Sequence, residues 1–219
     1  HVALLLLFAG PEGAFTLHGN FATRLDIILL GENHLYEGYG TFFEPEGILG
    51  TLTSTCNVLI GYLIGMIIRS SMARFAEGGK VEDSPTGIAA RLFSISAAAL
   101  GLGLFLSIWI PINKPLWSVS YVFYSCGWAI FSLALVTYLI DARGWEKPFF
   151  PFKALGMNAL ALFVLSGLLM RIIWMFTSWD YTAIFGVNEN MSLLYAVMYM
   201  LVHLMIAIIL YKKKIFIKL

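Results

Sequence analysis

Charged side chains are scarce in this chain. They make up 12% of its 219 residues, about half of the roughly 25% that is usual in soluble domains. Hydrophobic residues reach 59%, and the mean hydropathy is +0.82. A soluble core cannot bury that much apolar surface, so the composition excludes an ordinary soluble domain and indicates lipid as the solvent.

Cysteine is also nearly absent. Cys56 and Cys126 each lie within an apolar block, where a cysteine more often packs as a small hydrophobe than forms a disulfide or binds a metal. The net charge is +1, and no basic stripe lies outside the C-terminal lysines, which argues against nucleic acid as a partner. The sequence has no glycine-rich phosphate loop, paired-cysteine pattern or nucleophile elbow. We therefore expect no metal site.

What the sequence does contain is a series of apolar blocks of membrane-spanning length. About 20 apolar residues in a helix cross a bilayer core roughly 30 Å thick. Five blocks qualify as full spans, namely residues 47–68, 92–110, 119–140, 154–176 and 192–211. The apolar run 1–9 is too short to span and is expected to be the tail of a truncated helix. The predicted fold class is all-α, a polytopic transmembrane helical bundle in which residues 1–219 form a single membrane domain.

The basic residues predict the orientation of the bundle, because Lys and Arg in short loops stay on the cytoplasmic side. Eleven of them flank one set of connections and three flank the other. The larger set comprises Arg69, Arg74, Lys80, Arg91, Arg143, Lys147, Lys153, Lys212, Lys213, Lys214 and Lys218. The smaller set comprises Arg24, Lys114 and Arg171. The C-terminus is therefore expected in the cytoplasm, and the connections 10–46, 111–115 and 177–190 outside.

Residues 10–46 form the longest connection and are predicted to be an extracytoplasmic loop. The segment carries six acidic residues against one arginine. Phe21, Leu25, Ile28 and Leu29 recur at helical spacing, as expected for a short helix in the membrane interface. Such a helix would place residues 31–36 at the outer mouth of the bundle.

Two polar positions of this outer region are candidates for chemistry. Glu46, in Glu44-Pro45-Glu46-Gly47, opens the first full span. A carboxylate and a proline there suit a helix start, so capping alone would explain the motif, or Glu46 could hold an amine or hydroxyl of a substrate. His34 could exchange a proton near pH 7, or make an ordinary loop contact.

Further candidates lie in the spans and inner loops. Asn158 needs a partner in the bundle or in a ligand, and for the mid-span His203 a structural hydrogen bond is expected. Gly61 and Gly65 form a small-xxx-small pair that favours close helix packing. Trp117 is either an interfacial belt residue or a substrate contact. The inner basic residues fit the positive-inside rule, and could also hold phosphates of a cofactor.

Several strings in the sequence resemble the heparan-α-glucosaminide N-acetyltransferase family and its bacterial relatives. They are GENHLY (31–36), EPEGILGT (44–51), PINKPLWSVSY (111–121), LGMNAL (155–160) and the ending LYKKKIFIKL. The strings occur in order along nearly the whole chain. The resemblance covers the C-terminal half of such a protein, and where the family has an aspartate before Pro-Glu-Gly this chain has Glu44.

The resemblance implies a multi-pass acyltransferase that moves an acetyl group from cytosolic acetyl-CoA to an extracytoplasmic amino sugar or glycan. The catalytic residue stays unknown, because the family's transfer histidine belongs to an upstream segment; His34 is only a weak candidate, and the fragment alone is expected to be inactive. Expected substrate-binding residues are Asn33, His34, Glu46, Asn113, Trp117, Ser118 and Ser120. Expected acetyl-CoA-binding residues are Arg91, Arg143, Lys147 and Asn158.

The expected partners are the lipid bilayer, the sugar acceptor and the missing N-terminal half, and a homo-oligomer is left open. A bacterial inner membrane is favoured over a lysosomal membrane. The chief alternative function is a transporter or flippase for a sugar or lipid-linked glycan, since polar mouths on both sides suit passage equally well. A third alternative is a non-catalytic membrane subunit.

Overall fold

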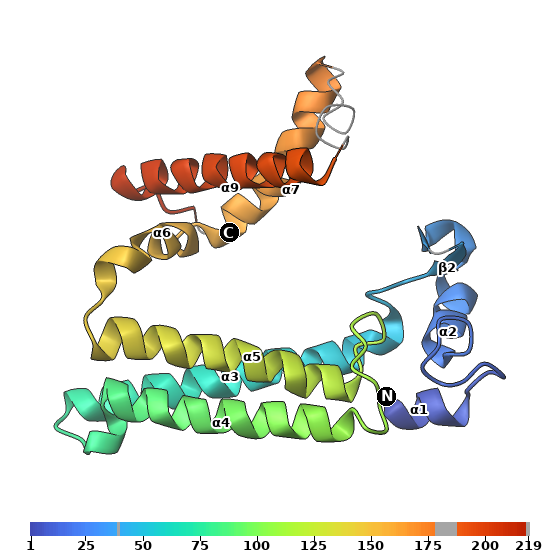
Figure 1. Ribbon diagram of the computed structural model, residues 1–219, viewed down its shortest axis with the longest axis horizontal. Helices are drawn as coiled ribbons and strands as arrows, with labels where there is room; N and C mark the ends of the chain where they lie inside the picture. Colours follow the sequence, from blue (N-terminus) through green and yellow to red (C-terminus); the bar gives the residue numbers. More distant parts are fainter. Residues whose placement is uncertain (39, 178–187, 218–219) are drawn as a thin grey trace. The chain divides into compact units, whose positions relative to one another are not determined.

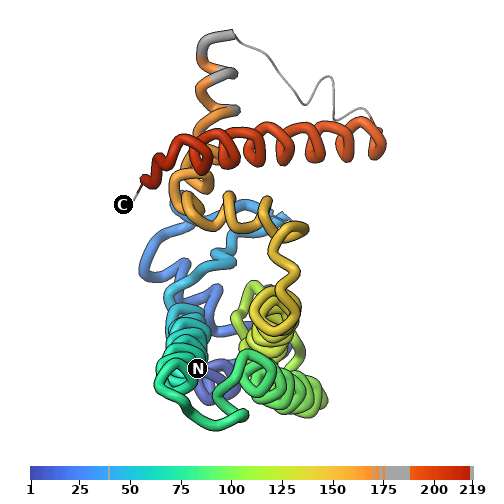
Figure 2. The backbone as a smooth tube through the Cα atoms, turned by 90° about the vertical axis from the view of Figure 1, so that its left-hand side faces the viewer, coloured from blue at the N-terminus to red at the C-terminus, as the bar shows by residue number. Residues whose placement is uncertain are grey.

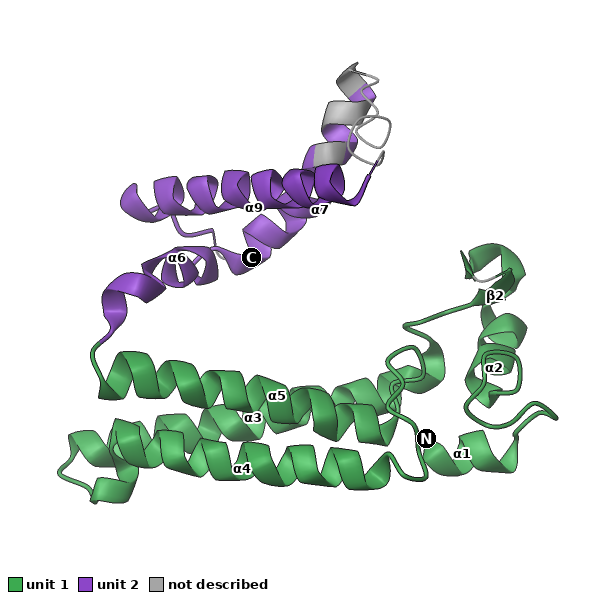
Figure 3. Cartoon of the chain, in the orientation of Figure 1, with its two compact units in different colours: residues 1–144 green, residues 145–219 purple. Residues whose placement is uncertain are grey.

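The computed structural model describes residues 1–38, 40–177 and 188–217 (Figure 1). The chain forms two compact units, His1–Gly144 and Trp145–Leu219 (Figure 3). The expectation of a single membrane domain stays a prediction.

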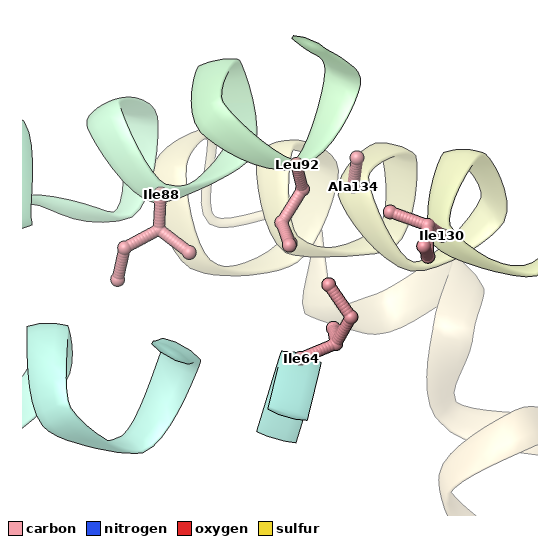
Figure 4. Close-up of a cluster of buried hydrophobic side chains, with 5 residues drawn as sticks. All are labelled: Ile64, Ile88, Leu92, Ile130 and Ala134. Carbon is pink, nitrogen blue, oxygen red and sulfur yellow. The ribbon is translucent and has the colours of Figure 1, made fainter. Parts of the chain in front are cut away.

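Three long helices make up most of the first unit: α3 (Ile48–Ala76), α4 (Pro85–Leu106) and α5 (Val119–Thr137). A π-helical turn, Tyr138–Ala142, extends α5, and a 3-10 turn, η2 (Val81–Asp83), precedes α4. Figure 2 views the three helices nearly end-on, packed side by side. One core cluster joins all three, with Ile64, Ile88, Leu92, Ile130 and Ala134 pointing toward one another (Figure 4).

Helices α4 and α5 approach each other closely at two glycines. A Cβ added at Gly103 would lie 2.7 Å from the backbone nitrogen of Tyr124, and one at Gly127 would lie 2.7 Å from the Leu100 side chain. The buried hydroxyl of Ser96 donates to the Gly127 carbonyl at 2.9 Å. Small residues at a helix interface let backbones approach and bring such hydrogen bonds within reach. These contacts make α4 and α5 a tightly packed hairpin.

A smaller layer covers the end of the first unit where α3 and α5 begin. It contains α1 (Val2–Leu7), α2 (Phe21–Leu30), the 3-10 turn η1 (Glu32–His34) and a hairpin of β1 (Tyr36–Gly38) and β2 (Thr41–Phe43). The helical spacing seen in the sequence is confirmed as α2, which begins at an Asn20 side-chain cap. A second cluster, Leu5, Ala22, Leu49 and Leu116, joins this layer to the bundle. Its placement in a membrane interface stays a prediction.

The second unit contains α6 (Glu146–Gly156), α7 (Ala159–Thr177) and α9 (Glu189–Lys212). The span expected at 154–176 is not one continuous helix, because α6 and α7 meet at a bend of 65°. Leu162 donates its backbone N–H to the Asn158 carbonyl, so a new helix starts at Asn158 rather than continuing α6. Ala154, Leu162 and Ala207 form the core of this unit.

Four helices of the described residues are long and apolar enough to cross a membrane, or five if the bent pair α6–α7 counts as one span. The all-α, polytopic prediction is therefore confirmed, and the chain is an integral multi-pass membrane protein. The first span is longer than expected, since α3 continues to Ala76. Of the connection predicted at 177–190, residues 178–187 lie outside the described residues.

Candidate functional site

The start of α3 is capped by a residue from another helix. Gly47 occupies the N-cap position and has no side chain to offer, and the Asp26 carboxylate of α2 accepts the Ile48 N–H at 3.0 Å instead. Glu46 is exposed and precedes the helix, and its own N–H donates to the Glu44 carboxylate at 3.2 Å. Capping of α3 by the Glu44–Glu46 motif is therefore wrong, because Asp26 occupies that position.

Asp26 is 1% exposed, the most buried carboxylate of the described residues. Burial raises the pKa of its carboxyl group, the Ile48 N–H lowers it, and the charge of Glu44 raises it. A Cβ on Gly47 would collide with the Asp26 carboxylate. A side chain at position 47 would therefore displace the Asp26 carboxylate from its present position.

A pocket of about 190 Å³ opens beside this junction. We call it the α2-end pocket. Its polar members are Thr16, Asn20, Thr23, Glu44 and Asn113. Its apolar members include Phe43 from β2 and Leu116 from the connection before α5. Of the expected substrate-binding residues, the pocket brings in Asn113.

The other expected residues of this end lie elsewhere. Asn33 and His34 are exposed on η1, where the His34 Nδ1 donates to the Leu30 carbonyl at 2.9 Å. Ser118 and Ser120 are 0% exposed, and their hydroxyls lie 2.8 and 3.0 Å from the Pro111 carbonyl. These two serines fix the connection between α4 and α5, so a substrate contact for them stays a prediction.

Trp117 joins α3 to the beginning of α5. Its indole Nε1 donates to the side-chain amide oxygen Oδ1 of Asn57 at 2.9 Å. The Asn57 amide nitrogen lies 3.2 Å from both the Ser125 hydroxyl and the Cys126 sulfur. Sequence reasoning did not single out Asn57, although a lone amide inside an apolar span signals a bundle-facing position. A membrane-belt role alone does not explain Trp117.

A second pocket, of about 530 Å³, lies at the opposite end of α3, where it connects to α4. We call it the α3–α4 pocket. Arg74 donates to the Asp83 carboxylate at 2.7 Å, and this guanidinium holds the pKa of Asp83 below its usual value. Arg91 lines the pocket and donates to the Ser71 hydroxyl at 3.3 Å. An arginine has five N–H donors, so Arg91 has further donors for a ligand.

This pocket is balanced in charge. Its lining holds three basic residues and three carboxylates, namely Arg74, Lys80, Arg91, Glu77, Glu82 and Asp83. Because Arg74 is paired with Asp83, the cations left to meet a phosphate are Lys80 and Arg91. Arg143 is exposed and lies 5.8 Å from the centre of the Tyr138 ring, and it is not among the residues lining this pocket.

The remaining expected cofactor residues belong to the second unit. Lys147 is exposed and lines a pocket of about 380 Å³ together with Glu146, Phe150, Lys153 and Tyr211. Asn158 is 1% exposed. Its amide donates to the Ile215 carbonyl at 3.1 Å and accepts the Ile217 N–H at 2.8 Å. The partner required for Asn158 is therefore the chain's own tail.

Two structural expectations have opposite outcomes. His203 makes the predicted hydrogen bond, with Nδ1 donating to the Tyr199 carbonyl at 2.8 Å. Close packing at Gly61 and Gly65 is wrong for the described residues, because a Cβ at either position would have no atom of another element within 4 Å. Gly61 instead lines an apolar groove between α3 and α5.

The amino-acid sequence was compared with those of known proteins. No family model matches the sequence. The mouse heparan-alpha-glucosaminide N-acetyltransferase is 31% identical over 179 residues, which is 72% of this chain and 25% of the mouse protein. The human protein of the same name is 32% identical over 165 residues, 67% of this chain and 22% of the human protein. The matched region spans about a quarter of these relatives. The chain belongs to the heparan-alpha-glucosaminide N-acetyltransferase family.

Proposed function

We propose that the chain forms part of a membrane-bound acyltransferase that moves an acetyl group from cytosolic acetyl-CoA to an extracytoplasmic amino sugar or glycan. The observation that carries this proposal is the identity of about 31% to relatives named as N-acetyltransferases. The multi-pass architecture agrees with it, since a membrane bundle can receive its two substrates from opposite faces.

The geometry of the first unit supports separate donor and acceptor sites at the two ends of α3. The α2-end pocket and the α3–α4 pocket lie at opposite ends of α3, which has 29 residues. At about 1.5 Å per residue, such a helix separates the two pockets by roughly 40 Å. This separation suits a donor and an acceptor that approach from different sides of a bilayer about 30 Å thick.

The α3–α4 end is the proposed donor side. It carries most of the basic residues of the first unit, and the positive-inside rule places it in the cytoplasm. Lys80 and Arg91 would meet the phosphates of acetyl-CoA, because Arg74 is already paired with Asp83. Arg143 and Lys147 remain proposed cofactor residues, whereas the Asn158 amide is bonded to the Ile215 and Ile217 backbone.

The α2 end is the proposed acceptor side. Glu44 and Asn113 line its pocket, and the exposed Glu46 donates its backbone N–H to the Glu44 carboxylate. Carboxylates favour a protonated amine and can accept hydrogen bonds from sugar hydroxyls. Acetyl transfer to nitrogen also needs a general base. That base is proposed to lie in the segment upstream of this chain, so residues 1–219 alone should show no transfer.

Labelled acetyl-CoA and glucosamine, incubated with the full-length protein, test this proposal. Wild-type protein should transfer label to the sugar. Glu46→Gln should fold normally and lose about ten- to hundredfold in turnover, as expected for a charge-assisted hydrogen bond worth roughly 1.5 to 3 kcal/mol. Glu12→Gln, a change at another exposed carboxylate of the same segment, is the matched control. An inactive wild type would contradict the proposal, and a fully active Glu46→Gln would remove Glu46 from the site.

The bent pair α6–α7 favours a second candidate function. Discontinuous helices are typical of secondary transporters, where helix ends inside the membrane bind the substrate. The break of 65° between Gly156 and Ala159 is a feature of this kind. Uptake of labelled sugar into proteoliposomes without acetyl-CoA would support a transporter, whereas acetylation without uptake would support the enzyme.

A further inference from the structure

The proposed chemistry does not use Asp26, although Asp26 is the most buried carboxylate of the described residues. Burying a charge is unfavourable unless it makes strong contacts. The contact here is the 3.0 Å hydrogen bond from the Ile48 N–H, between residues 22 positions apart in the chain. Burial and the nearby Glu44 both raise the pKa of Asp26. The site therefore keeps a carboxylate where its surroundings disfavour one.

The contact matters because α3 has no local substitute for it. Its N-cap residue is Gly47, which has no side chain, and Glu44 accepts a hydrogen bond from Glu46 rather than from the helix. The first N–H groups of a helix need outside acceptors. Without Asp26, the first turn of α3 would lose its hydrogen bond to α2 and would be held there by the apolar packing around Leu49 alone.

We propose that Asp26 is a positioning residue for the acceptor site, which holds the first turn of α3 against α2 and thereby fixes the turn that links Glu46 to Glu44 of the α2-end pocket. This inference rests on the proposed acyltransferase function. Asp26 itself is buried and acts through the backbone of Ile48, so it needs no contact with the acceptor. Gly47 contributes to the same positioning, since a side chain there would push the Asp26 carboxylate away from the Ile48 N–H.

Three substitutions in the full-length protein test the role of Asp26. Asp26→Ala removes the acceptor atom. Asp26→Asn keeps an oxygen that can accept the Ile48 N–H and removes the charge. Gly47→Ala keeps the carboxylate and displaces it, and its φ of −60° suits alanine. Glu12→Ala removes an exposed carboxylate from the same segment and serves as the control.

Two readouts separate positioning from mere stability. Hydrogen exchange at the Ile48 amide should be roughly two- to thirtyfold faster in Asp26→Ala and Gly47→Ala, as expected for a lost cap. Per folded molecule, both variants should lose about tenfold or more in kcat, because small displacements of a positioned group are costly. The KM for acetyl-CoA should not change, since the α3–α4 pocket lies at the other end of α3. Asp26→Asn and Glu12→Ala should behave as wild type in both readouts.

The possible results decide between the two proposals. Faster exchange with unchanged kcat and KM for the acceptor would overturn the positioning role and leave Asp26 as a cap only. An Asp26→Asn variant as impaired as Asp26→Ala would also overturn it, because charge rather than the acceptor atom would then matter. A wild-type protein that protects Ile48 but transfers no acetyl group would refute the acyltransferase function, and acceptor positioning with it.

Discussion

Gly101 and Gly103 lie two residues apart in α4 and should respond in opposite ways to alanine. A Cβ at Gly101 would have no atom of another element within 4 Å. A Cβ at Gly103 would lie 2.7 Å from the Tyr124 nitrogen and 3.1 Å from the Ser120 carbonyl oxygen, both in the α5 backbone. A backbone atom cannot rotate away as a side chain does, so Gly103→Ala must force α4 and α5 apart.

The size of the effect follows from two opposing contributions. Replacing glycine by alanine within a helix stabilises it by about 1 kcal/mol, and this gain applies at both positions. Overpacking a close interface costs about 1 to 3 kcal/mol, and this loss applies only at Gly103. The two variants should therefore differ by roughly 1 to 3 kcal/mol, or about 2 to 12 °C in Tm for a chain of this size.

Thermal unfolding of both purified variants in the same detergent measures this difference directly. Gly127→Ala provides a second test from the α5 side, because its Cβ would lie 3.0 Å from the Leu100 nitrogen as well as against the Leu100 side chain. Equal Tm values for Gly101→Ala and Gly103→Ala would refute the close packing of α4 on α5.

Three further predictions concern other parts of the chain. Asn158→Ala should destabilise the docked C-terminal tail by about 1 to 3 kcal/mol, because the Ile215 and Ile217 backbone groups lose their partner. The tail should then be cleaved faster by a protease. An unchanged rate of cleavage would argue against the contact. The ion pair lowers the pKa of Asp83, so it stabilises the fold above the unfolded pKa of about 3.9, and this stabilisation is lost as pH falls through the lower folded pKa. Asp83→Asn should therefore flatten the dependence of Tm on pH below about pH 5. An unaltered dependence would exclude this contribution. A cysteine at Gly79 should resist an impermeant thiol reagent applied from outside and one at Gly38 should react, and the reverse labelling would overturn the orientation.

The sequence predicts those parts of the fold that depend on local composition. The spans that became α3, α4, α5 and α9 follow from apolar blocks, since any such block must form its backbone hydrogen bonds internally in lipid. The short helix α2 follows from the spacing of four apolar residues. These features need no knowledge of distant contacts, which explains their success.

The parts that the sequence does not predict depend on contacts between distant residues. The break between α6 and α7 includes Asn158, whose side-chain partners Ile215 and Ile217 lie 57 and 59 positions away. Likewise, the first turn of α3 donates its Ile48 N–H to Asp26. Capping rules consider only residues next to Gly47 and would not select Asp26. Local rules therefore identified Glu44 and Glu46 at a position where the tertiary structure supplies another carboxylate.

The hydrogen bonds of Asn57 also have a consequence for synthesis of the chain. Its partners Trp117, Ser125 and Cys126 follow it by 60, 68 and 69 residues. Translation at about 5 to 20 residues per second delivers them roughly 3 to 14 seconds later. During that interval α3 carries an amide without its final partners, and an unsatisfied amide is unfavourable in hydrocarbon. We therefore expect the Asn57 side chain to stay beside water or the insertion machinery until α5 emerges.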